Sequence, residues 1–213
     1  MGEDSGAKVY AGEGSFTGDV TIGGNLTVSG TLVGAGNLVS VTESSSTGVR
    51  LSTAVAANHG NIGSNAVDLS YSDGGSYTRG ATGIASTAMG YKTTASGSYS
   101  TAIGDNSFAT GTASTAIGSY TTASGYRSTA MGDGTSATDY ASLTIGRYNS
   151  VNKTVTTGGN ATSFDTDNAA FVIGNGTLWN ATSDAFVVYF NGNATLSGDL
   201  TINSDERLKE NIQ

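Results

Sequence analysis

The chain contains neither cysteine nor proline, and it is poor in large aliphatic residues. Without cysteine, a disulfide framework and any zinc site built on thiolates are excluded. Leucine, isoleucine, valine and phenylalanine make up only 39 of the 213 residues, and the net charge is −8, a composition that usually indicates disorder. The longest purely apolar run, Ala185 to Phe190, is far too short to cross a bilayer, so we expect no membrane insertion.

Signals for catalysis and for nucleic-acid binding are also scarce. The acidic balance and the scattered lysine and arginine residues argue against a nucleic-acid partner. Met1 to Gly14 is acidic and Gly-rich, so we expect no signal peptide there. His59 is the only histidine, and we expect it in a turn or on the surface. Asp165 and Asp167 lack the further ligands of a calcium loop, so a solvated loop is favoured over a cation site. We predict a protein that is not an enzyme and that uses neither cofactor nor metal.

What the chain does contain is a repeat of 14 residues, with five gapless copies from 84 to 153 and a partial copy before them. The third position is always serine, the seventh is always glycine, and the twelfth is alanine in four copies and valine in the fifth. The sixth position is always large and aliphatic: Met89, Ile103, Ile117, Met131 and Ile145. So short a period is typical of one coil of a β-solenoid.

The alternation of side chains within each copy predicts where they point. In Ser-Thr-Ala-Ile-Gly, neighbouring side chains face opposite sides of a strand. Alanine is expected to fill a narrow interior, opposite the alanine of a second strand, while the sixth position builds a core shared between subunits. The glycines tolerate positive φ and let coils approach closely. We therefore predict an all-β parallel β-roll in a homotrimeric fibre, because a trimer adds a shared core along its axis to the thin core of each coil.

A second period, of six residues, occurs near both ends of the chain. Glycine recurs at positions 18, 24, 30 and 36 with an apolar residue two places later, and the pattern returns at 192–203. Three chains wound around one axis would bury these strands and remove free sheet edges. We predict triple-stranded β-prism stems whose trimer core includes Leu26, Leu32 and Leu200. The alternative is a single-chain hexapeptide β-helix, although so few coils would hardly stand alone.

Between the array and the second stem, residues 169–173 and 185–190 look like strands, and Trp179 lies in the loop between them. We predict a compact β neck that clamps the trimer, with a small monomeric hairpin as the alternative. The predicted order is an N-terminal arm (1–13), a stem (14–42), a transition segment (43–83), the β-roll (84–153), the neck (154–191), a second stem (192–204) and the start of a truncated chaperone segment (205–213).

The array resembles the left-handed β-roll heads of trimeric autotransporter adhesins, and the same repeat occurs in fibres of phages and large viruses. The resemblance rests on the Ser-Thr-Ala-Ile-Gly and Ala-Ser-Gly motifs and covers about 70 residues. It implies a left-handed β-roll and a homotrimer.

The C-terminal run from Ser204 to Lys209 resembles the junction at which endosialidase-type intramolecular chaperones begin. In that family a C-terminal chaperone trimerises the fibre and then cuts itself off. The resemblance implies a scissile bond between Ser204 and Asp205, with Ser204 and Lys209 as the reacting pair, since a desolvated lysine can activate a serine hydroxyl. The sequence stops at Gln213, so we expect autoproteolysis only when the rest of the chaperone domain is present in cis.

Tyrosine is the feature of the array with the most recognition potential. Its ring can pack on a sugar or on a protein surface while its hydroxyl hydrogen-bonds. The favoured alternative is packing on neighbouring coils or between subunits, and one period of separation predicts that Tyr126 and Tyr140 stack. The candidate binding residues are Tyr91, Tyr99, Tyr120, Tyr126, Tyr140 and Tyr148.

These patterns predict a structural and host-recognition fibre. We expect an extracellular homotrimer, carried on a virion as a phage or virus tail fibre, that presents a rigid β-roll to a glycan or protein of the host cell surface. A bacterial trimeric surface adhesin is the alternative. A depolymerising tailspike is a third reading, but it would need a catalytic insertion with clustered carboxylates, which the sequence lacks.

Overall fold

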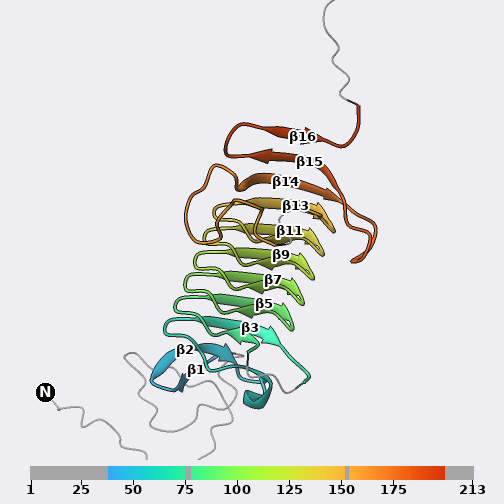
Figure 1. Cartoon of the computed structure of the whole chain (residues 1–213). Helices are drawn as coiled ribbons and strands as arrows, with labels where there is room; N and C mark the ends of the chain where they lie inside the picture. The colour runs from blue at the N-terminus through green and yellow to red at the C-terminus, as the bar shows by residue number, and fades with distance from the viewer. Residues whose placement is uncertain (1–37, 75–77, 152–153, 200–213) are drawn as a thin grey trace, which may run out of the picture. The chain divides into compact units, whose positions relative to one another are not determined.

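A computed structural model describes residues 38–74, 78–151 and 154–199, all within one of the chain's two compact units, Gly36–Gln213 (Figure 1). This part is all-β apart from one short 3₁₀ helix, η1 (Ala56–Asn58). The larger sheet consists of β1 (Leu38–Glu43), β2 (Ser46–Leu51), β3 (Val67–Tyr71), β5 (Thr87–Tyr91), β7 (Thr101–Asp105), β9 (Thr115–Ser119), β11 (Thr129–Asp133), β13 (Leu143–Arg147), β14 (Ala169–Asn175), β15 (Asp184–Tyr189) and β16 (Ala194–Leu196). The smaller sheet consists of β4 (Gly80–Ala81), β6 (Thr94–Ala95), β8 (Phe108–Ala109), β10 (Thr122–Ala123) and β12 (Ser136–Ala137).

Each of the first four coils of the array contributes one long and one short strand, the fifth contributes the long strand β13, and successive coils stack in parallel (Figure 1). The register is the sequence period itself, since Thr101 lies opposite Thr115 and Ile103 opposite Ile117. The short strands follow the same rule, with Ala109 opposite Ala123. The predicted parallel β-solenoid with coils of 14 residues is therefore confirmed.

The interior of the solenoid is narrow and consists of small side chains. Its buried apolar cluster contains Ile62 and otherwise only alanines, and each array alanine of the fifth and twelfth positions is fully buried. Serines at the third position close the corner in three of the five copies: the hydroxyl of Ser86 donates to the carbonyl of Gly83 at 2.8 Å, and Ser128 and Ser142 make the equivalent contact. The large aliphatic residues lie outside, as the alternation predicted.

The seventh-position glycines allow the coils to stack. Gly104 has φ of 121°, a conformation that side chains rarely tolerate, and a Cβ there would lie 1.9 Å from the carbonyl oxygen of Gly118. No rearrangement short of separating the two backbones could relieve that contact. Glycine is therefore required at the seventh position for neighbouring coils to stack at the observed spacing.

The solenoid begins before the array. β2 and β3 pair in parallel within the predicted transition segment, and β3 continues into β5. β1 pairs antiparallel with β2, so residues 38–42, assigned from sequence to a triple-stranded stem, lie in a hairpin of their own chain. The hairpin forms because the turn at Ser44 and Ser45, both with positive φ, returns the chain onto the edge of the first coil. The rest of that stem lies outside the described residues.

The sheet also continues beyond the array. The strands predicted around 169–173 and 185–190 are present as β14 and β15, but β14 pairs in parallel with β13, so the predicted neck extends the solenoid sheet. Ile173 lies opposite Ile145, two periods later in the chain, and the hydrophobic pattern therefore resumes in phase. β15 and β16 then add antiparallel strands, and β16 belongs to the segment assigned to the second stem. Within the described residues, no helix is long and apolar enough to span a membrane.

Candidate binding surfaces

The outer face of the larger sheet carries a continuous apolar row, which we call the apolar ladder. Strand pairing places its members opposite one another from β3 to β16. The side chains of Met89 and Met131 are each 41% exposed, and Leu196 is 44% exposed. At about 4.8 Å per strand the ladder is roughly 40 Å long. Its members are Leu69, Met89, Ile103, Ile117, Met131, Ile145, Ile173, Phe186 and Leu196.

A second row on the same face widens the ladder near its C-terminal end. Leu143, Phe171 and Val188 lie opposite one another there, whereas threonines occupy this row in the first four copies of the array. Phe171 also makes an edge contact with Phe186 of the ladder, with ring centroids 6.4 Å apart. All five candidate trimer-core residues of the array lie on the ladder. Leu26, Leu32 and Leu200 lie outside the described residues.

The candidate tyrosines do not form one site. Tyr126 and Tyr140 stack with centroids 5.7 Å apart and planes 3° apart, which confirms the predicted ladder, and Arg127 lies over the Tyr126 ring. Tyr91 stacks on Tyr71 of the preceding coil at 6.1 Å. These three candidate tyrosines therefore pack on neighbouring coils.

Of the other three candidate tyrosines, Tyr120 and Tyr148 occupy the ninth position of their copies, and Tyr99 occupies the second. Tyr99 and Tyr120 are 65% and 60% exposed. Tyr120 and Tyr148 share a cavity of about 370 Å³ with Gly134, Ser136 and Trp179. Trp179 was expected in the loop between two strands, with no role in binding. The signal that could have drawn attention to it is that it is the only tryptophan of the chain.

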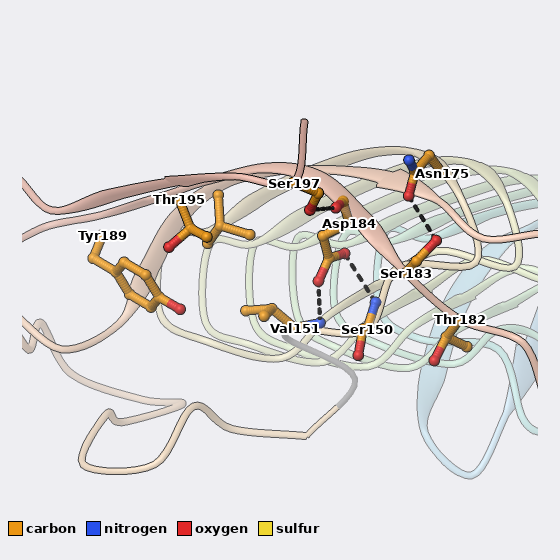
Figure 2. A pocket seen from close by; sticks show the side chains of 10 residues that line it. Ser150, Val151, Asn175, Thr182, Ser183, Asp184, Tyr189, Thr195 and Ser197 are labelled. Atoms are coloured by element: carbon orange, nitrogen blue, oxygen red, sulfur yellow. Dashed lines mark hydrogen bonds between the residues drawn. The ribbon is translucent and has the colours of Figure 1, made fainter. Parts of the chain in front are cut away.

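A second cavity, of about 390 Å³, lies where β15 and β16 meet the end of the array (Figure 2). Asp184 is buried at its centre, and its carboxylate accepts hydrogen bonds from the amides of Ser150 at 2.9 Å and Val151 at 2.6 Å. The hydroxyl of Ser197 donates to the Asp184 carbonyl. This carboxylate holds the end of the array against the start of β15, so we interpret the cavity as a structural junction.

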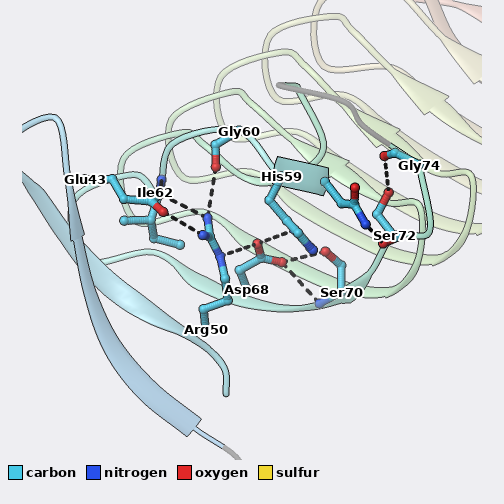
Figure 3. A network of polar contacts seen from close by, with 10 residues as sticks. Glu43, Arg50, His59, Gly60, Ile62, Asp68, Ser70, Ser72 and Gly74 are labelled. Carbon is cyan, nitrogen blue, oxygen red and sulfur yellow. Dashed lines mark hydrogen bonds and ion pairs between the residues drawn. The ribbon is translucent and has the colours of Figure 1, made fainter. Parts of the chain in front are cut away.

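A buried polar network closes the N-terminal end of the interior (Figure 3). Arg50, only 3% exposed, pairs with Glu43 at 2.9 Å and with Asp68 at 3.3 Å. Arg50 and Asp68 lie opposite each other, and Asp68 lies opposite Ala88, so charged side chains replace alanine at the start of the inner column. In the alternating pattern of their strands, Arg50 and Asp68 occupy inward-facing positions. The sequence contained this signal, but it was not recognised as a buried network.

His59 belongs to this network: it lies at the end of the η1 turn, in line with the expected turn, but it is buried and not on the surface. It is 3% exposed, and its Nδ1 lies 3.1 Å from Oδ2 of Asp68. The hydroxyl of Ser70 donates to the other carboxylate oxygen at 2.6 Å. The sequence around this single histidine gave no indication of the contact, because the contact depends on how the η1 turn folds over the first coil.

The carboxylates of Asp68 and Asp73 both have a lowered pKa. Burial by itself would raise the pKa of Asp68, but hydrogen bonds from His59 and Ser70, together with the charge of His59, lower it below 3.8. At the surface, a hydrogen bond from Lys92 and another from Tyr91 lower the pKa of Asp73. The same contact with Asp73 raises the pKa of Lys92. Both carboxylates are therefore held in their ionised form, each beside a basic side chain.

The predicted self-cleavage residues Ser204, Asp205 and Lys209 lie outside the described residues. Asp165 and Asp167 lie in the loop after the array, where Asp165 accepts a hydrogen bond from the Asp167 amide at 3.0 Å. Among the described residues, no group of three or more histidine, aspartate or glutamate side chains is arranged to hold a metal ion.

The array has a counterpart among known families. A family model described as the YadA head domain repeat matches the chain twice, over residues 81–107 and 109–135. Both matches fall on coils whose strands pair in regular parallel register. Neither a curated protein nor a solved structure matches the chain. The β-roll of this chain is therefore similar to the head domain of YadA-type adhesins, over the stretch from 81 to 135.

Proposed function

We propose that this chain is the head-like β-roll of a homotrimeric extracellular fibre that attaches to a cell surface. The observation that carries the proposal is the apolar ladder, which leaves the largest aliphatic side chains of the array outside the coil. A soluble chain of this composition gains more by covering them with further copies of itself than by leaving them in water. We assign it no catalytic activity.

The core of a single copy supports this proposal. Fully buried residues of the coils are mainly alanine, serine and threonine, which contribute little apolar area. The larger aliphatic residues of the array are all partly or largely exposed, the reverse of the usual distribution. Association along the ladder would therefore supply much of the missing hydrophobic stabilisation.

The number of copies follows from the likeness to YadA-type heads, which are trimeric. Three ladders around one axis would form a continuous core, and the threonines beside them would lie at its rim. Mechanically, such a fibre presents three identical faces, so that weak contacts with a cell surface add by avidity.

Sedimentation of the full chain and of two variants tests the trimer. Ile117→Asp places a charge in the ladder, and desolvating it in a shared apolar core would prevent assembly. Thr110→Asp, an exposed position beside the short strand β8, is the matched control. We expect a trimer for the parent chain and the control, and none for Ile117→Asp. A monomeric parent chain, or a trimeric Ile117→Asp variant, would overturn the proposal.

The fibre could be carried by a virus particle or by a bacterial cell. The motif from Ser204 to Lys209 favours a phage or virus tail fibre. The β-roll itself supports a bacterial surface adhesin equally well. A polypeptide that continues beyond Gln213 with a chaperone would be cut between Ser204 and Asp205. Mass spectrometry should find a product ending at Ser204, and Ser204→Ala and Lys209→Ala should abolish it. An uncut polypeptide would favour the adhesin.

A further inference from the structure

The cavity at Tyr120, Gly134, Ser136, Tyr148 and Trp179, which we call the aromatic slot, is built by a variation within the repeat. Tyr120, Gly134 and Tyr148 all occupy the ninth position, on three successive coils. Two tyrosines thus flank a glycine at one corner of the solenoid. With no side chain at 134, the Tyr148 ring lies over the glycine, and the cavity opens beside that ring.

Gly134 also determines how the Tyr148 ring lies. Gly134 has φ of 62°, and a Cβ on it would be 2.2 Å from Cε1 of Tyr148. The ring therefore rests on the glycine backbone and forms a wall of the slot. The exposed ring of Tyr120, two coils before Tyr148, also lines the slot.

Trp179 is brought to the slot by a short loop anchored on the last coil. At the start of the loop, the Gly176 amide donates to the Arg147 carbonyl at 2.9 Å, and at its end the Ser183 amide donates to the Tyr148 carbonyl at 3.1 Å. A bridge between Leu178 and Ala181 closes the loop tip. Trp179 is thus held beside Tyr148 by backbone contacts that do not depend on its own side chain.

We infer that the aromatic slot binds a neutral pyranose unit of a cell-surface saccharide. This inference rests on the proposed attachment function and names its ligand class. Tyrosine and tryptophan rings offer flat apolar faces with a polar edge, which suit the C–H faces of a sugar. The tyrosine and serine hydroxyls and the indole N–H are the lining groups that can donate hydrogen bonds, and the hydroxyls also accept them, as sugar hydroxyls do. A volume of about 370 Å³ is within the range of small-ligand sites.

Charge and hydrogen-bonding chemistry disfavour two other ligands of aromatic slots. Single-stranded nucleic acid stacks on aromatic rings, but it needs a positively charged groove, and this chain has a net charge of −8. Proline-rich peptides also dock on aromatic residues. Their backbone offers hydrogen-bond acceptors only, so the accepting groups of the slot would be left unused.

The slot faces away from the apolar ladder. Ala130 and Ala137 both point into the interior from the two strands of one coil, so Met131 and Ser136, their neighbours in sequence, point outward on opposite sides. Trimer formation along the ladder would leave the slot open. Three slots per fibre would then raise a weak affinity for a saccharide-bearing surface.

The single tryptophan makes the inference directly measurable. Emission of Trp179 in the full chain is followed while lactose, cellobiose or diacetylchitobiose is added, with sialyllactose as a charged comparison and polyproline as the peptide comparison. We expect a saturable shift with at least one neutral disaccharide, with a dissociation constant on the order of 1 mM because few atoms are bound. Tyr148→Ala and Tyr120→Ala should each weaken binding about tenfold.

Two further variants keep the test decisive. Tyr99→Ala removes an equally exposed tyrosine outside the slot and should leave the titration unchanged. Gly134→Asn retains every aromatic ring, tolerates positive φ, and should abolish binding by displacing the Tyr148 ring. Far-ultraviolet circular dichroism confirms that each variant is folded. No shift with any neutral disaccharide, a shift that survives both Gly134→Asn and Tyr148→Ala, or a stronger response to polyproline would overturn the inference.

The outcome is separable from that of the proposed function. A trimeric chain that attaches to cells but shows no disaccharide titration contradicts the saccharide inference alone. A monomeric chain whose Trp179 still titrates with a disaccharide contradicts the trimeric fibre and leaves the slot assignment standing.

Discussion

The carboxylate of Asp139 accepts a hydrogen bond from the backbone amide of Ala169 at 2.7 Å, and this contact joins the array to the strand that follows its long loop. The same buried carboxylate accepts hydrogen bonds from the amide of Thr156 at 2.8 Å and from its hydroxyl at 2.6 Å. One side chain therefore fixes both the start of the loop and its return to the sheet.

Asp139 occupies the fourteenth position, which is glycine in the three preceding copies. A Cβ on Gly125 would lie 2.1 Å from the carbonyl oxygen of Asp139. Glycine is therefore required at this corner wherever a further coil stacks on it. At Asp139 the loop takes the place of a regular coil, and its polar groups need an acceptor. The break in the repeat thus marks where regular stacking ends.

We predict that Asp139→Ala lowers the free energy of unfolding by about 3 kcal/mol, because the buried amide of Ala169 and the two half-buried donors of Thr156 lose a charged acceptor. Urea unfolding of parent and variant at equal protein concentration measures the change. Asp165→Ala, in the same loop but bonded only to a local amide, should cost less than about 1 kcal/mol. Equal losses for the two variants would contradict the role given to Asp139.

Gly118→Ala should prevent stable folding of the solenoid. A Cβ at Gly118, where φ is 134°, would lie 2.0 Å from the carbonyl oxygen of Gly132, and two backbones would have to separate. We expect a loss of more than about 3 kcal/mol, seen as loss of the cooperative thermal transition. Gly198→Ala, which meets no atom within 4 Å, should change stability by less than about 0.5 kcal/mol.

Ala116→Leu should destabilise the chain by about 3 kcal/mol or more, because the interior between the two strands is filled by alanine and has no room for larger side chains. Ile117→Leu, on the outer face of the same strand, should cost less than about 1.5 kcal/mol. Thermal melting of both variants gives the comparison. A well-tolerated leucine at position 116 would mean that the interior is wider than the structure shows.

Stability should fall in acid through Asp68. Its folded pKa is lowered below the ordinary 3.8, so its ionised form contributes stability that is present above that value and is lost as pH falls through the lower, folded pKa. Urea midpoints measured from neutral to strongly acidic pH should decline over this window. Asp68→Asn should be less stable at neutral pH, because Arg50 and His59 lose their charged partner, and should show a flatter acid decline. An unchanged acid decline would exclude Asp68 as its source.

Much of the fold followed from local pattern. The period of 14 predicted the parallel register, the alternation placed Ala116 inside and Ile117 outside, and Gly104 was predicted where coils approach closely. These inferences succeed because each coil contacts only its neighbours, so one period of sequence contains nearly all the contacts that shape it.

The ends of the solenoid and the placement of Trp179 at the aromatic slot were decided by tertiary structure alone. Asp139 meets Ala169 thirty residues later, and Arg50 and Asp68 meet across two strands, contacts that no repeat encodes. Trp179 reaches the tyrosine corner only because its loop is anchored on the last coil. Beyond the last regular repeat, each backbone group finds its hydrogen-bond partner in a segment that is distant in sequence. Which segment folds back depends on the free energy of the whole chain.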